Sequence, residues 1–102
     1  NTAGNYNTAN GYAALYSNTT GVHNTANGFY ALFSNTTGNS NTATGYEALN
    51  SNTGSYNNAN GYQALYSNTT GEKNTAIGTL AGGYSPANTT GENNIFIGYK
   101  NK

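Results

Sequence analysis

The chain has no cysteine, methionine, tryptophan, aspartate or arginine, and a single proline in its 102 residues. Without cysteine there can be no disulfide, so the cysteine count says nothing about the redox compartment. One histidine and three scattered glutamates are too few ligands for a zinc site or a repeat-type calcium site. We therefore expect no metal and no cofactor.

Charge is also scarce. Charged residues make up 6% of the chain and the formal net charge is zero, which leaves no electrostatic footprint for nucleic acid. No apolar run approaches the roughly 18–20 residues of a membrane helix, so we expect no membrane insertion by this segment. The absence of cysteine, methionine and tryptophan suits an exposed, extracellular protein.

What the chain does contain is a repeat of about 17 residues, represented by NNANGYQALYSNTTGEK at residues 57–73. The units are residues 7–23, 24–40, 41–56, 57–73 and 74–93. Residues 1–6 match the end of a preceding unit, and residues 94–102 begin a more apolar terminal unit or a junction. Because the chain opens in mid-repeat, we interpret it as a processed chain or a segment of a longer one.

Positions counted from the Asn that opens each unit fall into constant and variable classes. Position 3 is Ala, position 5 Gly and position 8 Ala in all five units, whereas position 6 is aromatic and position 9 is Leu in four. An Asn-Thr-(Thr)-Gly turn follows. The constant residues include Ala9, Gly11, Tyr12, Ala14, Leu15 and Gly21 of the first unit, Ala26, Gly28, Phe29 and Leu32 of the second, and Ala59, Gly61, Tyr62 and Leu65 of the fourth.

This separation of constant from variable positions favours a folded repeat over a polar, low-complexity disordered tract. Gly, Thr and Asn are poor helix formers, and small residues at alternate places have the period of short strands. The sequence predicts an all-β fold, a repetitive β-solenoid (a parallel β-helix or β-roll) with about 17 residues per coil.

The alternation also predicts which side chains enter the coil. We expect Tyr12, Ala14 and their equivalents to face inward, and position 7 (Ala13, Tyr30, Glu47, Gln63) to face solvent. A corner would turn Leu15 inward too, and the Gly after Asn-Thr-Thr would supply left-handed backbone there. Asn side chains on successive coils are expected to form amide ladders, with a stack of Tyr rings beside them.

The energetics favour an oligomer. Each coil offers one Leu and one or two aromatic rings, worth roughly 1.5–3 kcal/mol each when fully buried, against a backbone ordering cost of at least about 1 kcal/mol per residue. A core shared among chains would help, so we predict a homo-oligomer. The apolar segment Ile95-Phe96-Ile97 is interpreted as a cap or a junction, and residues 82–87 as a loop bulging from the rod.

Motifs of the type NTANGYQALYSNTTG resemble the repeats of bacterial surface proteins and phage-like proteins with tail-fibre domains. The segment Asn74-Thr75-Ala76-Ile77-Gly78 is similar to the NSVAIG motif of YadA-type trimeric autotransporter adhesin heads. The resemblance covers residues 1–99 and implies a β-roll or β-helix, a homotrimer and a place in an extracellular fibre. The adhesin motif has aliphatic residues where this chain has Asn10, Asn27, Thr44 and Asn60.

The residues give no sign of an enzyme. His23 is a single histidine in a variable turn position, and the nearest acid in sequence, Glu47, belongs to a position expected to face solvent. Gly82-Gly83 is too short for a phosphate-binding loop. The Asn-x-Thr sequons at Asn18, Asn35, Asn68 and Asn88 are interpreted as turn chemistry.

We therefore expect a structural shaft or head segment of an extracellular fibre or adhesin, which spaces or presents a binding tip. One alternative is a module that binds a host-surface glycan or another cell-surface receptor directly, through side chains such as Tyr30, Gln63 and Tyr84. Aromatic residues repeated along an exposed face would favour this alternative, whereas their burial between chains would favour the shaft. A further alternative is a self-assembling filament. The Thr residues at position 2 also raise the possibility of an ice-binding surface, but Asn58 interrupts this row of Thr.

Overall fold

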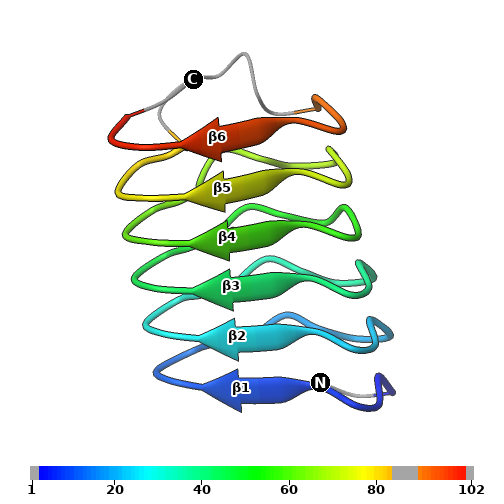
Figure 1. The fold of residues 1–102 in the computed structure, drawn as a ribbon. Helices are drawn as coiled ribbons and strands as arrows, with labels where there is room; N and C mark the ends of the chain where they lie inside the picture. Colours follow the sequence, from blue (N-terminus) through cyan, green and yellow to red (C-terminus); the bar gives the residue numbers. More distant parts are fainter. Residues whose placement is uncertain (1–2, 84–89, 101–102) are drawn as a thin grey trace.

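The computed structural model describes residues 3–83 and 90–100, which wind into a β-solenoid with one three-residue strand per coil (Figure 1). The strands are β1 (Thr8–Asn10), β2 (Thr25–Asn27), β3 (Thr42–Thr44), β4 (Asn58–Asn60), β5 (Thr75–Ile77) and β6 (Ile95–Ile97). They form one parallel sheet in chain order, and equal positions of successive units pair, as in Ala9 opposite Ala26. The predicted all-β solenoid of about 17 residues per coil is confirmed.

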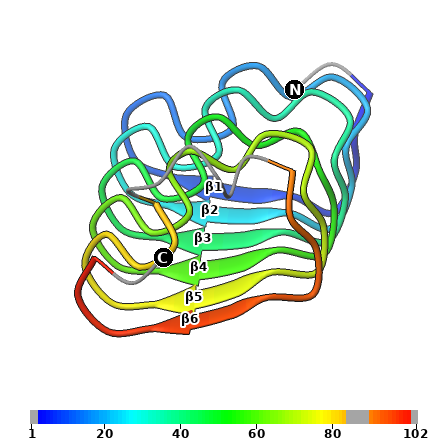
Figure 2. The same cartoon turned by 90° about the horizontal axis from the view of Figure 1, so that it is seen from above.

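Each strand leads into linked tight turns. After Gly11 (φ 133°), the Ala14 amide donates to the Gly11 carbonyl over 3.3 Å and the Tyr16 amide to the Ala13 carbonyl over 3.3 Å. Ala13 and Leu15, the third residues of these two turns, have φ of 58° and 54°, as a type II turn requires. Figure 2 shows the resulting undulating segment on the side of the coil opposite the sheet.

The left-handed backbone of non-glycine residues recurs at positions 7 and 9 in successive coils. Such a conformation costs about 1–2 kcal/mol per residue. The neighbouring coils offset this cost, because the alternate amides bond between coils: Leu15 donates to the Ala31 carbonyl (3.0 Å) and Tyr30 to the Tyr12 carbonyl (2.9 Å). Stacking therefore holds each coil in a shape that one unit alone would not keep.

One half of the coil interior is apolar. Position 3 Ala from the sheet faces position 8 Ala and position 9 Leu from the turns, and from the second coil to the fourth these side chains are fully buried. Ala14 packs against this core and Leu15 is 4% exposed. The prediction that both the Ala and the Leu enter the interior is confirmed.

The other half of the interior is built from asparagine. Position 1 Asn accepts the next coil's amide and reaches across to the turn: Asn41 Oδ1 accepts from the Asn57 amide (2.9 Å), and Asn41 Nδ2 donates to the Gly54 carbonyl (2.8 Å). The same bonds recur in the other coils. A second buried column starts each turn: Asn18, Asn35, Asn52 and Asn68. The expected amide ladder is present in part: in the second column Asn35 Nδ2 donates to Asn18 Oδ1 (3.0 Å) and Asn68 Nδ2 to Asn52 Oδ1 (2.7 Å), whereas most position 1 bonds go to backbone groups.

The inward orientation predicted for position 6 is wrong. Tyr12 is 70% exposed and Phe29, Tyr46 and Tyr62 are 40–47% exposed. Strand alternation ends at the Gly of position 5, whose positive φ redirects the chain, so the side chain that follows lies outside the coil. The interior is already occupied by Leu and Ala, and the rings stack on one another along the outer corner instead.

The role predicted for the turn glycines is also wrong. Gly21, Gly38, Gly54 and Gly71 do not have positive φ. They are required because a Cβ would overlap a carbonyl of the next coil; at Gly38 it would overlap the Gly54 carbonyl oxygen and Asn35 Oδ1. Close approach of stacked backbones, and not backbone handedness, accounts for this glycine.

The last coils exchange one core residue for another. Gly82 occupies position 9, where the preceding units have Leu, and Phe96 occupies position 3, where they have Ala. A Cβ at Gly82 would lie 2.7 Å from Phe96 Cδ2, so the Phe96 ring fills the space left by the missing Leu. Phe96 is 7% exposed, whereas Ile95 and Ile97 are 73% and 63% exposed on the outer face of the sheet. Whether this segment is a cap or a junction stays a prediction.

Candidate functional site

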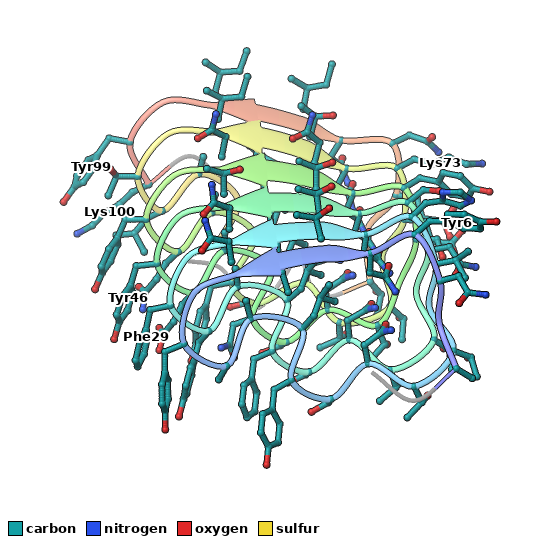
Figure 3. The ribbon with its side chains drawn as sticks, turned by 90° about the horizontal axis from the view of Figure 1, so that it is seen from below. Tyr6, Phe29, Tyr46, Lys73, Tyr99 and Lys100 are labelled. Carbon is teal, nitrogen blue, oxygen red and sulfur yellow. The ribbon has the colours of Figure 1, made fainter. Side chains whose placement is uncertain are left out.

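The most distinctive surface is an aromatic corner, which we define as the exposed and half-buried rings at positions 6, 7 and 10. At position 6 the rings of Tyr12, Phe29, Tyr46 and Tyr62 follow one another with centroid separations of 5.5, 5.1 and 5.1 Å and interplanar angles of 14°, 6° and 7°. Parallel, in-register coils force this repetition. Figure 3 shows the row of rings projecting outward, with Phe29 and Tyr46 labelled.

Coil two carries a denser cluster of rings. Tyr30 at position 7 lies between Phe29 (4.3 Å between centroids, 7° between planes) and Phe33 at position 10 (4.6 Å, 22°). Phe33 in turn stacks on Tyr16 of coil one at 5.4 Å. These rings therefore form a continuous stack along one coil as well as between two coils.

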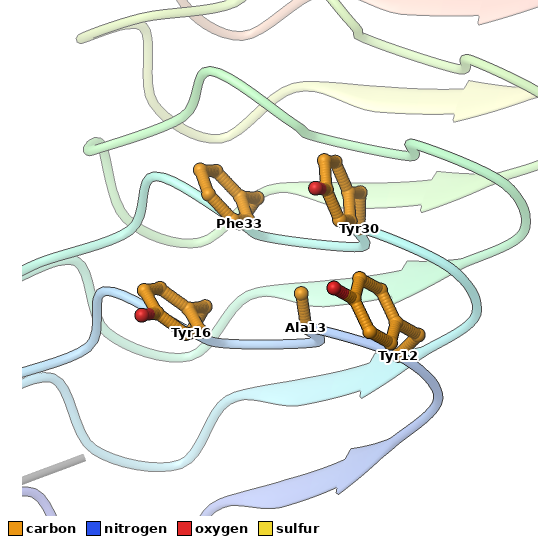
Figure 4. A pocket seen from close by; sticks show the side chains of 5 residues that line it. All are labelled: Tyr12, Ala13, Tyr16, Tyr30 and Phe33. Carbon is orange, nitrogen blue, oxygen red and sulfur yellow. The ribbon is translucent and has the colours of Figure 1, made fainter.

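A pocket of about 350 Å³ opens beside this cluster (Figure 4). Tyr12 and Tyr16 stand on either side of Ala13 in coil one, and Tyr30 and Phe33 supply the wall from coil two. None of the lining side chains carries a charge. The pocket can therefore accept a neutral, mostly apolar group, with phenol hydroxyls as its side-chain polar atoms.

Position 7 becomes polar in the next two coils. Gln63 Nε2 donates to Glu47 Oε2 over 2.7 Å, and both side chains are half-buried. Desolvation and, to a lesser extent, the negative charge of Glu47 raise the pKa of the Tyr46 phenol above its ordinary value. A phenol is protonated at neutral pH even at its ordinary pKa, so the Tyr46 hydroxyl is a hydrogen-bond donor there.

The outer face of the sheet is the second exposed surface. Positions 2 and 4 of β1 to β4 present Thr and Asn there, whereas β5 and β6 present Ile77 (49% exposed), Ile95 and Ile97. Figure 3 shows a row of side chains projecting from the outer face of the sheet, away from the coil interior. The change from polar to apolar along one flat face marks the C-terminal coils as different.

The candidate contact residues from the sequence have different surroundings. Tyr30, in coil two, is half-buried within the ring cluster and lines the pocket. Gln63, in coil four, is hydrogen-bonded to Glu47 of coil three. Tyr84 and the rest of residues 84–89 lie outside the described residues. His23 is exposed, and its ring stacks on Tyr6 at 5.1 Å.

Sequence reasoning missed the pocket, although the signal was present. Position 7 holds Ala13 in the first unit and Tyr30 in the second, between aromatic residues at positions 6 and 10 in both. A small residue between two aromatic residues leaves a gap once the rings point outward. The wrong inward orientation of position 6 hid this consequence.

No protein-family model, no curated protein and no solved structure matches this chain. Within residues 3–83 and 90–100, no three metal-ligating side chains gather at one place. In the same part of the chain, no helix has the length and apolar character of a membrane span.

Proposed function

We propose that the chain is a structural shaft or head segment of an extracellular fibre or adhesin, and that it acts as a homotrimer to space or present a binding tip. The observation that carries the proposal is the exposed apolar patch at Ile77, Ile95 and Ile97 on an otherwise polar sheet face. Fully burying an Ile side chain is worth about 1.5–3 kcal/mol. A second and a third copy packed on this face would bury these Ile side chains, and this burial would add to the small apolar core inside each chain.

The rest of the fold suits a shaft. The Leu column and the Asn column that starts the turns are buried in each of the first four units. Repetition of this kind allows length to be added without changing the cross-section. The backbone bonds run between coils along the axis, which resists extension.

The test is the mass of the chain in solution by light scattering. We expect about three chain masses, and a monomer for the triple variant Ile77→Asn, Ile95→Thr, Ile97→Asn, with an unchanged β spectrum by circular dichroism. These replacements are already present at the same positions of earlier coils (Asn10, Thr25, Asn27), so folding should survive. A matched control is Tyr62→Thr, which alters the aromatic corner as Thr79 does one coil later.

A folded wild-type monomer would contradict the trimer. If the triple variant remains a trimer but Tyr62→Thr dissociates it, the interface lies at the aromatic corner and not at the Ile patch. Large, polydisperse particles would support the filament instead.

A second candidate, direct binding of a surface glycan, is favoured by one observation: the position 6 rings are repeated along an exposed face of the single chain. We propose a glycan array with the wild-type chain and with Tyr46→Thr as the test. Binding that is lost in the variant would support this candidate, and absence of binding across the array would contradict it.

A further inference from the structure

Coils one and two have the same backbone but differ by one ring. Ala13 and Tyr30 both occupy position 7, with φ of 58° and 57°. In coil two the Tyr30 ring lies between Phe29 and Phe33, at 4.3 and 4.6 Å between centroids. In coil one Tyr12 and Tyr16 take the places of these two rings, and the pocket lies above Ala13 between them (Figure 4).

The protein therefore contains its own example of what fits this place. A ring inserted between Tyr12 and Tyr16 would repeat the arrangement of Tyr30 in the neighbouring coil, with an aromatic face on each side. Such offset-stacked pairs contribute beyond their buried area. The Tyr30 ring, 5.8 Å from Tyr12, would form a further wall.

We propose that the pocket above Ala13 is a binding site for a planar, neutral aromatic ring of about the size of a phenol. The ring would come either from a free small molecule or from an aromatic side chain of a peptide. A sugar ring is disfavoured, because no amide or carboxylate side chain lines the pocket to bond its several hydroxyls. An anionic ring is disfavoured, because no cationic side chain lines the pocket.

The first experiment is a titration of the full chain with p-cresol, followed by the NMR methyl signal of Ala13. We expect saturable binding with one site per chain. The variant Ala13→Tyr fills the pocket as Tyr30 does in coil two and should weaken binding at least about tenfold. The variant Tyr16→Asn, which copies Asn50 of coil three, removes one face and should weaken it by about tenfold.

For both variants, binding is followed by saturation-transfer difference signals of p-cresol, because Ala13→Tyr removes the reporting methyl group. Circular dichroism confirms that they remain folded. Gln63→Ala is a matched gain-of-site variant, because units one and four read GYAALYS and GYQALYS. It should create a second, weaker site between Tyr62 and Tyr66, since Leu80 and Gly83 replace two aromatic walls there.

A second titration, with N-acetyl-tyrosinamide, distinguishes a free aromatic molecule from an aromatic side chain of a peptide. Tighter binding than p-cresol would indicate a peptide side chain, and equal or weaker binding a free aromatic molecule; both agree with the proposal. Binding unaffected by Ala13→Tyr, no binding up to the solubility limit, or tighter binding of methyl β-glucoside at the same methyl signal would overturn it. The last result would support the glycan candidate, and none of these outcomes bears on the trimer.

Discussion

The two halves of the coil interior are equally buried but are stabilised differently. In the apolar half, Ala and Leu side chains fill space, and their energy depends on volume. In the polar half, each position 1 Asn is held by directed bonds to the next coil and to the turn, as Asn41 is. Its contribution to stability depends on every buried donor and acceptor having a partner. Replacing a buried Leu by an apolar side chain of similar volume should therefore destabilise the fold less than replacing a buried Asn by a side chain that cannot form its hydrogen bonds.

The largest effect is expected in the apolar half. Leu49 is fully buried at the middle of the stack, so Leu49→Ala should lower the free energy of unfolding by about 2–5 kcal/mol. Chemical denaturation followed by circular dichroism measures the change. Leu49→Met, which nearly conserves volume, should cost less than about 1.5 kcal/mol; an equal loss for both variants would contradict a volume effect.

In the polar half, Asn41→Ala should cost about 2–4 kcal/mol. It leaves the buried Asn57 amide without its acceptor and removes one donor from the Gly54 carbonyl. Thr42→Ala, at an exposed neighbouring position, should change stability by no more than about 0.5 kcal/mol. The comparison fails if Asn41→Leu, which restores volume without the bonds, is as stable as the wild type.

A third test concerns the exchange between Gly82 and Phe96. Phe96→Ala should open a cavity, and Gly82→Leu should clash with the ring, because its Cβ would lie 2.7 Å from Phe96 Cδ2. The double variant restores the Leu and Ala of the other coils, and φ of 62° at Gly82 matches that of the Leu residues at the same position. We expect a favourable coupling of about 0.5–3 kcal/mol in a double-mutant cycle; additive losses would show that the two residues are independent.

The sequence was sufficient for the solenoid, the coil length and the Ala and Leu columns, because small and apolar residues in register leave few other ways to stack. It was misleading at Tyr12, because a position can be constant for stacking outside the coil as well as for burial within it. It was misleading at Gly38, because close backbone approach and left-handed backbone both select glycine. It gave no warning of left-handed backbone at Leu15, since that conformation depends on bonds from the neighbouring coil.

The smallest effect is expected at a defect in the polar half. Unit three has Asn52-Thr53-Gly54, one Thr short of the turn in the units on either side of it. Asn35 donates to Asn18 Oδ1 and Asn68 to Asn52 Oδ1, but Asn35 Oδ1 is buried without a partner. The short turn therefore interrupts the ladder.

Inserting a Thr after Thr53 should let Asn52 donate to Asn35 Oδ1 and raise the free energy of unfolding by about 1 kcal/mol. Denaturation midpoints of the two chains measure the gain. A Thr inserted after Thr69, where the turn is already full length, serves as the control and should destabilise the chain. A gain from both insertions would point to turn length in general, whereas a gain at unit three alone would show that directed bonds, and not filled space, limit the polar half.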